Sequence, residues 1–315
     1  MRTFLSVNEV TKKYANHLAI NNLSLQVPEN SIYGLLGPNG AGKTSLIRII
    51  NQITAPDKGS ILLNGEVLSP EHISRIGYLP EERGLYKKMK VGEQALYLAR
   101  LKGMPKNIAR QKLLYWFEKF EIENWWNRKV EELSKGMQQK IQFIVTILHQ
   151  PELLIFDEPF SGFDPINVNL LKEEILKLRE QGATIIFSTH NMASVEELCD
   201  HIALINNGNK ILEGTVNEIR EAHRTHTFEC EIKQPVDSIK QDLEQLSVTL
   251  NKFVRKADNS VRITITSDAE SSGNQLIKKL LPLGELSDFK ELLPSMNDIF
   301  IAQVSATNIK TDSHE

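Results

Sequence analysis

Cysteine and long apolar runs are scarce in this sequence. Its two cysteines, Cys199 and Cys230, lie 31 positions apart, which excludes a disulfide framework and a CxxC metal or redox pair and fits a reducing compartment. No stretch approaches the roughly 20 uninterrupted apolar residues of a membrane-spanning helix, and residues 1–10 lack the apolar core of a signal peptide. We therefore expect a soluble chain that stays where it is made.

An excess of positive charge is missing as well. The 37 Lys and Arg residues against 40 Asp and Glu leave a formal net charge of -3. This charge excludes a protein whose main function is to coat nucleic acid through a generally basic surface. Apolar residues make up 41% of the chain, as in ordinary globular proteins. At roughly 150 residues per domain, the 315 residues predict about two domains.

Four short apolar runs predict buried strands that alternate with helical segments. They are residues 31–36, 152–156, 184–188 and 201–205. Such alternation predicts an α/β fold with helices packed on the faces of a sheet. Between about residues 87 and 150 the strand signals vanish, and helical runs at 91–101 and 107–120 indicate a helical insertion. We expect this first domain to cover residues 1–220.

The last third of the chain predicts a second, smaller domain. A polar helical stretch at 216–224 forms a linker, and from about Thr227 the order is strand, helix, strand, strand, helix, strand. The residues Asp258-Asn259-Ser260 predict the hairpin turn between strands at 248–256 and 261–266. We expect a small α+β domain at 227–310, followed by a polar tail at 311–315.

A glycine-rich segment after the first of these strands fills the P-loop pattern G-x4-G-K-[ST]. Its residues are Gly37, Pro38, Asn39, Gly40, Ala41, Gly42, Lys43 and Thr44, and Ser45 opens the helical run that follows. The glycines let successive N–H groups point at phosphate oxygens above a helix N-terminus. Lys43 is expected to reach the β- and γ-phosphates, and Thr44 to offer an oxygen to Mg²⁺. The alternative is a glycine-rich turn that binds nothing.

Two carboxylates end the strand predicted at 152–156. Because buried charge is costly unless paired or metal-bound, Asp157 is expected to hold Mg²⁺. Glu158 is expected to point the other way on the pleat and to polarise an attacking water. The alternative is an acidic strand end that faces solvent.

His190 ends the strand predicted around 184–189. It could contact the γ-phosphate or fix the attacking water, since ligands gather at the carboxyl ends of strands in such sheets. The alternative is a histidine that only satisfies local hydrogen bonds.

Residues 133–137, Leu-Ser-Lys-Gly-Met, precede a long amphipathic run, and we name them the signature segment. Ser134 is a natural N-cap, which alone could explain its presence. The segment also resembles the LSGGQ signature of ATP-binding cassette (ABC) proteins, and it lies 23 residues before Asp157, as is typical of that family. Over roughly residues 1–220, the chain therefore resembles an ABC ATPase that uses ATP and Mg²⁺.

This resemblance implies further roles. Tyr14 would stack on adenine, residues 161–164 would form the loop after the catalytic acid, and His190 would be the switch histidine. Two cassettes would close head to tail, so that Ser134 and Gly136 of one cap the nucleotide on the P-loop of the other. A homodimer is expected, because one chain carries only one copy of each motif.

Two departures from the family pattern stand out. The signature segment has Lys135 and Met137 where the family often has Gly and Gln, which keeps Ser134 and Gly136 but alters the rim of the phosphate site. Glu81 occupies the place of a Gln that usually senses Mg²⁺ and water; it keeps an oxygen ligand and adds charge, so we count it among the catalytic and metal-binding residues. The loop at 77–86 and the small C-terminal domain resemble exporter-type cassettes, including sodium-extrusion and drug-efflux systems.

The three tryptophans, Trp116, Trp125 and Trp126, lie within the insertion near a set of basic residues. That set is Lys87, Lys88, Lys90, Arg100, Lys102, Lys106 and Arg110. The aromatics could be core residues beside a solvated face, or they could form a docking surface for a partner helix or a membrane-proximal face.

Two functions follow from the resemblance. The first is the ATPase subunit of an exporter, which drives a separate transmembrane permease from the cytoplasmic face of the membrane. The second is a soluble ABC ATPase acting on ribosomes or nucleic acid. Soluble members of these kinds usually hold two cassettes or long coiled coils, and this chain has neither, so we expect the transporter and no nucleic-acid partner.

Overall fold

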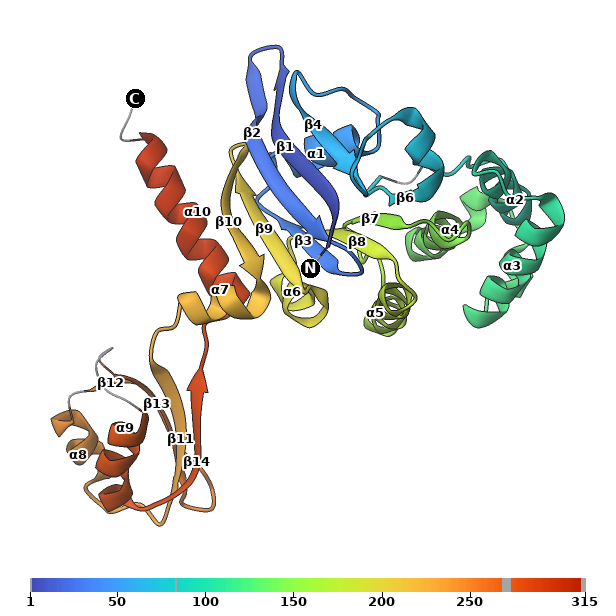
Figure 1. Ribbon diagram of the computed structural model, residues 1–315. Helices are drawn as coiled ribbons and strands as arrows, with labels where there is room; N and C mark the ends of the chain where they lie inside the picture. The colour runs from blue at the N-terminus through green and yellow to red at the C-terminus, as the bar shows by residue number, and fades with distance from the viewer. Residues whose placement is uncertain (1, 83, 247, 268–272, 313–315) are drawn as a thin grey trace. The chain divides into compact units, whose positions relative to one another are not determined.

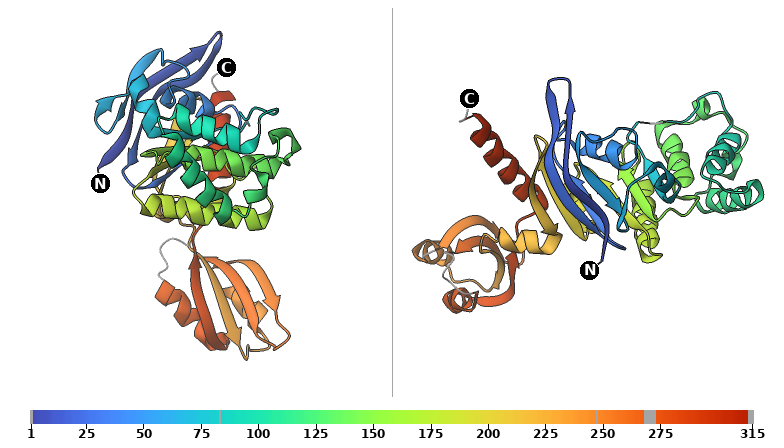
Figure 2. Two further views of the ribbon diagram at one scale, coloured as in Figure 1. Left: turned by 90° about the vertical axis from the view of Figure 1, so that its right-hand side faces the viewer. Right: turned by 45° about the horizontal axis from the view of Figure 1, so that its top comes forward.

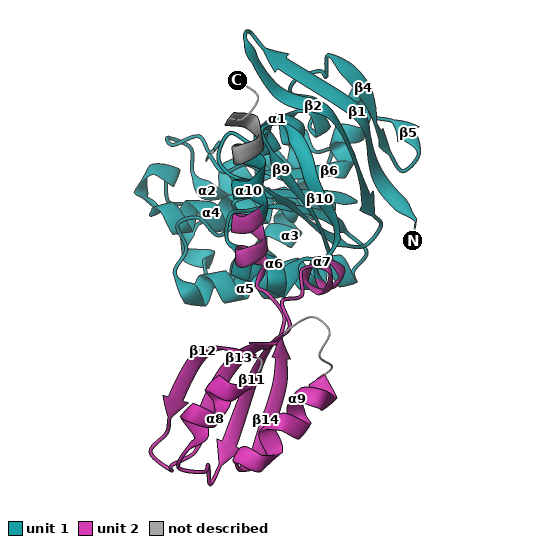
Figure 3. Ribbon diagram, turned by 90° about the vertical axis from the view of Figure 1, so that its left-hand side faces the viewer, with its two compact units in different colours: residues 1–216, 303–315 teal, residues 217–302 magenta. Residues whose placement is uncertain are grey.

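The computed structural model describes residues 2–82, 84–246, 248–267 and 273–312. The chain forms two compact units, one made of residues 1–216 with 303–315 and the other of residues 217–302 (Figure 3). Arg83 of the loop at 77–86 and residues 313–315 of the polar tail lie outside the described residues. No helix in the described ranges is both long and apolar enough to cross a membrane.

The centre of the first unit is a six-stranded sheet in the order β10-β9-β3-β8-β7-β6. Its strands are β3 (Ile32–Leu36), β6 (Ile76–Leu79), β7 (Leu153–Asp157), β8 (Thr184–Ser188), β9 (His201–Asn206) and β10 (Asn209–Thr215). All pairs are parallel except β9 with β10. Every residue of β3, β7 and β8 is buried, as expected for strands covered on both faces. The four predicted strands are confirmed.

A second, antiparallel sheet lies beside the first (Figure 1). It consists of β1 (Thr3–Tyr14), β2 (His17–Pro28), β4 (Lys58–Leu63) and β5 (Glu66–Val67), in the order β2-β1-β4-β5. One hydrophobic cluster joins residues of β1, β2 and β4 to the helix α1 (Lys43–Ile50) and to the central sheet. No pattern in the sequence predicted this sheet.

The insertion contains α2 (Val91–Leu101), α3 (Lys106–Lys119) and α4 (Lys135–Ile147), together with the short 3-10 helices η2 (Glu123–Trp125) and η3 (Val130–Glu132). These three helices gather at one end of the unit (Figure 2). Trp126 packs on Phe117 with ring centroids 5.4 Å apart, so part of the aromatic set is structural. Three further elements, η1 (Pro70–Arg75), α5 (Pro165–Glu180) and α6 (Met192–Leu198), complete the connections between strands.

The second unit has the predicted order of strands and helices. It runs β11 (Thr227–Lys233), α8 (Ile239–Gln245), β12 (Val248–Arg255), β13 (Val261–Ser267), α9 (Gly273–Leu280), the turn η4 (Leu281–Leu283) and β14 (Glu285–Leu292). All strands are antiparallel, in the order β12-β13-β11-β14, which is the βαββαβ ferredoxin-like arrangement. The inner face of the sheet and both helices share a hydrophobic core.

The predicted hairpin turn is confirmed. Ser260 donates hydrogen bonds to Asp258 from both its backbone N and its hydroxyl, and Asn259 adopts a left-handed conformation with φ 63°, which Asn tolerates well. Two helices join the units in sequence: α7 (Val216–Ala222), where a helical linker was predicted, and α10 (Met296–Asp312), which was not predicted.

Candidate functional site

The segment between β3 and α1 has the backbone that a phosphate cradle needs. Gly37 has φ 152°, and a Cβ there would lie 2.2 Å from the carbonyl oxygen of Ile205. Gly42 has φ 111°, and its Cβ would lie 2.4 Å from the carbonyl oxygen of Ala19. Only glycine fits these positions, because an added side chain would collide with fixed backbone. Gly42 is also the N-cap of α1, so the loop leads directly to a helix N-terminus.

Lys43, the first residue of α1, points back into this loop. Its ammonium donates to the carbonyl oxygens of Gly37 at 2.6 Å and Pro38 at 3.1 Å. Burial lowers the pKa of Lys43, and the negative charges of Glu158, Asp157 and Glu81 act in the opposite direction. A cation is thus held close to three carboxylates at the mouth of the P-loop, where phosphate oxygens would supply better partners than backbone carbonyls.

Asp157, at the end of β7, is 4% exposed. Burial raises the pKa of Asp157, and the charges of Glu81 and Glu158 raise it further, whereas Lys43 lowers it. A buried carboxylate in such a place gains from a cation beside it. Within the described residues, no group of three or more His, Cys, Asp or Glu side chains is arranged to hold a metal ion. A magnesium ion here would therefore depend on Thr44 and on phosphate oxygens as well as on Asp157.

Glu158 lies beyond the end of β7. The expectation that strand alternation turns its side chain away from that of Asp157 is therefore wrong. The strand ends at Asp157, and Glu158 takes a left-handed conformation with φ 48°. Its backbone N donates to the carbonyl oxygen of Ser188 at 2.9 Å. This turn fixes the carboxylate beside the end of β8, and a non-glycine residue in such a conformation is strained.

Three hydrogen bonds hold the Glu158 carboxylate. Oε2 accepts from the Thr189 hydroxyl at 3.1 Å, and Oε1 accepts from the His190 backbone N at 2.9 Å. The His190 Nδ1 lies 2.6 Å from the same Oε1. The side chain of His190 is 76% exposed while that of Glu158 is 16% exposed. The structure thus brings two of the predicted catalytic residues into contact and leaves the imidazole accessible.

A cavity of about 520 Å³ brings together predicted residues from four separate segments. It is lined by Tyr14, Thr44, Glu81 and Asp157. Tyr14 is 39% exposed, and the ammonium of Lys12 lies 5.4 Å from the centre of its ring. The residues present therefore fit a nucleotide with its magnesium ion: an aromatic ring for a base, a cradle for phosphates, and oxygen ligands between them.

The cavity also has walls that sequence analysis missed, including Arg48 of α1 and Tyr78 of β6. Arg48 lies inside the predicted helical run. Tyr78 lies in the segment 77–86, which was predicted as a loop but begins within strand β6. The P-loop motif carries no signal that Arg48, about one helical turn after Thr44, or Tyr78, on another element, reaches the same cavity.

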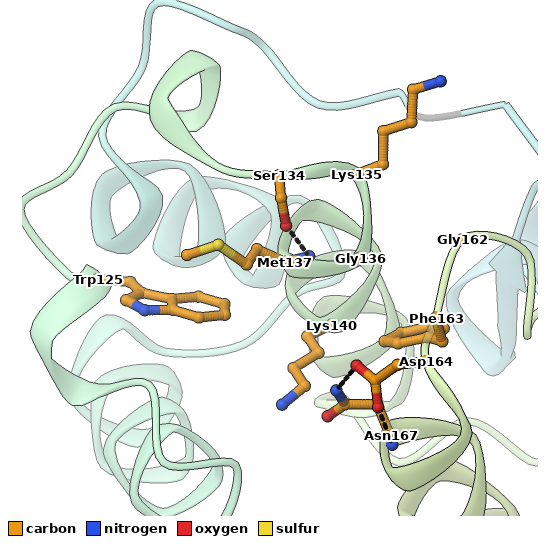
Figure 4. A pocket seen from close by; sticks show the side chains of 10 residues that line it. All are labelled: Trp125, Ser134, Lys135, Gly136, Met137, Lys140, Gly162, Phe163, Asp164 and Asn167. Atoms are coloured by element: carbon orange, nitrogen blue, oxygen red, sulfur yellow. Dashed lines mark hydrogen bonds between the residues drawn. The ribbon is translucent and has the colours of Figure 1, made fainter.

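The signature segment lies at a separate cavity of about 470 Å³. Ser134 is the N-cap of α4, as predicted, and its hydroxyl accepts a hydrogen bond from the Met137 backbone N at 3.3 Å (Figure 4). A Cβ on Gly136 would lie 2.9 Å from the carbonyl oxygen of Gly162. Gly136 therefore lets the signature segment approach the loop at 161–164 closely.

Figure 4 shows the other side chains of this cavity: Met137 extends toward Trp125, Lys140 points into the space between Trp125 and Asn167, and Lys135 points away. Asp164, the N-cap of α5, accepts hydrogen bonds from the backbone N of Ile166 and Asn167. Within one chain, Ser134 and Gly136 do not line the cavity that holds Thr44 and Asp157.

A third cavity, of about 550 Å³, lies between the insertion and the edge strand β6. We call it the groove. Its walls include Leu98 and Leu101 of α2 and Val145 of α4, and Leu101 is 65% exposed. Lys102 donates to the carbonyl oxygens of Ile73 and Ile76 at 2.9 Å and 2.8 Å, so it joins α2 to the edge of the sheet rather than lying on a solvated basic face.

Comparison with known proteins gives consistent matches over both units. Residues 20–161 match the family model described as ABC transporter, and residues 214–304 match the model described as ATP-binding protein DrrA1-3-like, C-terminal domain. The uncharacterized ABC transporter ATP-binding protein YhaQ of Bacillus subtilis (strain 168) is 42% identical over 302 residues, which is 96% of this chain and 99% of that protein.

One further curated protein and one solved structure match most of this chain. The Nod factor export ATP-binding protein I of Cupriavidus metallidurans is 31% identical over 82% of this chain and 84% of that protein. A solved structure of the ATP binding subunit of an ABC transporter has a TM-score of 0.65 and 30% identity, covering 70% of this chain and 93% of that one.

Proposed function

Because the chain belongs to the ATP-binding proteins of ABC transporters, we propose that it hydrolyses ATP to power export through a separate membrane permease. The observation that carries this proposal is the cavity shared by Tyr14, Thr44, Glu81 and Asp157 beside the P-loop. The cavity offers a ring for adenine and oxygen ligands for Mg²⁺, and the adjoining P-loop offers N–H groups for the triphosphate.

Binding would use the P-loop residues from Gly37 to Ser45. Backbone N–H groups of the loop would donate to phosphate oxygens, and the Lys43 ammonium would exchange the carbonyls of Gly37 and Pro38 for the β- and γ-phosphates. Thr44, Asp157 and Glu81 would supply the oxygen ligands on the protein side. Bound Mg²⁺ would neutralise phosphate charge and polarise the bond that breaks.

Hydrolysis would depend on Glu158 and His190. The Glu158 carboxylate is fixed by Thr189 and by the backbone of His190, so it can accept a proton from a water placed in line with the γ-phosphate. The exposed His190 ring, held through Nδ1, leaves its other nitrogen to contact the γ-phosphate. Orientation and charge would supply most of the rate enhancement, as in other phosphoryl transfers.

A complete site would need a second copy of the chain. Ser134 and Gly136 lie at an open cavity of their own, and the α4 N-terminus presents N–H groups that suit phosphate oxygens. We infer that two identical chains pair head to tail, each closing its signature segment over the nucleotide of the other.

The groove is the surface that we assign to the permease, and the chain would then work at the cytoplasmic face of the membrane. Its apolar walls suit a short helix. Export rather than import is supported by the export function named for the Cupriavidus relative.

The test is co-expression of the chain with membrane proteins whose reading frames adjoin its own. The proposal expects a detergent-stable complex with a polytopic protein, ATPase activity that depends on Mg²⁺, and loss of the complex when Val145 in the groove is replaced by Glu. A chain that sediments with ribosomes and leaves such membrane proteins unbound would contradict it.

A further inference from the structure

Two exposed charges of the first unit have no partner in their own chain. Glu81 and Lys135 are both exposed, and neither forms an ion pair or a side-chain hydrogen bond among the residues that the structure describes. Exposed charges are common on protein surfaces. These two differ from the others because each lies on a surface that the proposed function brings against a second copy of the chain.

Glu81 lies at the phosphate end of the nucleotide cavity. It lines that cavity together with Thr44 and Asp157. Its charge acts to raise the pKa of Lys43 and the pKa of Asp157, whereas the charge of the neighbouring Glu82 affects neither. Glu81 is therefore the exposed carboxylate that lies closer to the place where a triphosphate would bind.

The cations of this cavity do not balance Glu81 once a nucleotide is bound. The ammonium of Lys43 is held by the carbonyl oxygens of Gly37 and Pro38 and would turn to the phosphates. Arg48 lines the cavity, but it forms no ion pair with Glu81 within the described ranges. A triphosphate would add negative charge beside Glu81, and like charges repel strongly where water is excluded. A cation from outside the cavity would therefore stabilise the loaded site.

Lys135 is a cation that can enter from another chain. It stands between Ser134 and Gly136, the two residues proposed to cap the nucleotide of a second copy. Its side chain points away from the signature cavity of its own chain (Figure 4), and its flexible four-carbon stem carries the ammonium beyond the reach of its neighbours. The surface that closes thus carries an unpaired cation, and the surface that it closes on carries an unpaired anion.

We propose that, when two copies of the chain close on ATP, Lys135 of each copy forms an ion pair with Glu81 of the other at the edge of the triphosphate. This inference rests on the head-to-tail pairing proposed above and names a residue pair that strengthens it. Glu81 in place of Gln and Lys135 in place of Gly then belong together, because the added anion and the added cation offset each other. In a symmetric dimer the pair occurs twice.

The test is a cycle of substitutions in the Glu158→Gln chain, in which ATP is expected to bind without being hydrolysed. Sedimentation velocity at saturating ATP and Mg²⁺ gives the dimer dissociation constant. We expect Lys135→Ala to weaken the dimer by about tenfold or more, because two close charge pairs are lost at once. Lys135→Glu should weaken it further, since two carboxylates would then face each other. In the Glu81→Gln background, Lys135→Ala should change the constant by less than about twofold, as expected of residues that act through each other.

Lys106→Ala is the matched control. Lys106 is the first residue of α3 as Lys135 is the first residue of α4. It is also exposed and lines neither the signature cavity nor the nucleotide cavity. This substitution should leave the dimer dissociation constant within about twofold. ATP binding to the monomer is measured for every variant, so that a lost dimer is not confused with a lost nucleotide. Added salt should weaken the unsubstituted dimer more steeply than the Lys135→Ala dimer, because salt screens charge pairs.

A Lys135→Ala dimer as tight as the unsubstituted one overturns the proposal. An equal loss with and without Glu81→Gln also overturns it, because Lys135 would then act without Glu81. A Glu158→Gln chain that binds ATP and stays monomeric would instead contradict the proposed head-to-tail pairing itself.

Discussion

The most informative single residue is Lys43, because its ammonium already occupies the loop where phosphates would bind. We expect Lys43→Ala to lower ATP affinity by at least about 100-fold, since each charge-assisted hydrogen bond contributes about 1.5–3 kcal/mol. The measurement is equilibrium binding of ATP with Mg²⁺. Lys58→Ala is the matched control, because Lys58 is exposed on β4 and does not line the nucleotide cavity.

A Lys43→Ala variant that binds ATP as tightly as the parent would show that the P-loop is only a structural turn. The three carboxylates near Lys43 make a second outcome informative. If the variant binds ATP only at high Mg²⁺, the negative charge of Asp157, Glu158 and Glu81 is the barrier that Lys43 offsets.

At the scale of elements, the insertion depends on one close contact between α2 and the segment after η2. A Cβ on Gly92 would lie 2.4 Å from the indole ring of Trp126, and Trp126 is itself packed on Phe117. We expect Gly92→Ala to lower the free energy of unfolding by about 1–3 kcal/mol, the usual cost of overpacking. The measurement is urea denaturation followed by tryptophan fluorescence.

Gly84→Ala is the control for this effect, because no atom lies within 4 Å of a Cβ built at Gly84. It should leave the stability unchanged within about 0.5 kcal/mol. Equal stability of Gly92→Ala and the parent would mean that Trp126 moves aside freely, and the insertion would then be less tightly packed than the ring contacts indicate.

Helices and strands with a clear pattern of hydrophobic residues were predictable from the sequence. The strands β3, β7, β8 and β9 are continuous apolar runs, and α2 begins and ends where its pattern does, at Val91 and Leu101. The long strands β1 and β2 were missed because their exposed and buried residues alternate irregularly across bulges. No local pattern records such pairing, which depends on a partner strand elsewhere in the chain.

The site was predictable where chemistry dictates residue type. A phosphate site is indicated by the glycines and lysine of the P-loop and by the carboxylates at a strand end. The structure brings Thr44, Glu81 and Asp157 to one cavity. The left-handed turn at Glu158 was not predictable, because it is stabilised by partners 30 or so residues away in β8 and beyond. Tyr78 was missed for a similar reason: it reaches the nucleotide cavity only because β6 pairs with β7 in the folded chain.

At the scale of the whole molecule, every proposed nucleotide contact belongs to the first unit, and the second unit has a hydrophobic core of its own. A chain that ends after Arg224 should therefore bind ATP within about twofold of the parent affinity, since distant sites contribute independently. The measurement is again equilibrium binding with Mg²⁺.

This truncation also removes residues 303–315, which group with the first unit. The control is a chain that lacks only those residues. If the longer truncation loses ATP binding while the control keeps it, the second unit contributes to the nucleotide site, and the assignment of the site to the first unit alone would be wrong.

If ATP joins two copies of this chain, the mass of the Glu158→Gln variant in solution should differ with and without ATP and Mg²⁺. We expect a monomer without nucleotide, a stable dimer with ATP, and no hydrolysis, because the amide cannot accept a proton from water. Adding Ser134→Arg should abolish the dimer while each chain still binds ATP. A variant that stays monomeric with ATP bound would rule out this dimer, and one that hydrolyses ATP at the parent rate would exclude Glu158 as the catalytic base.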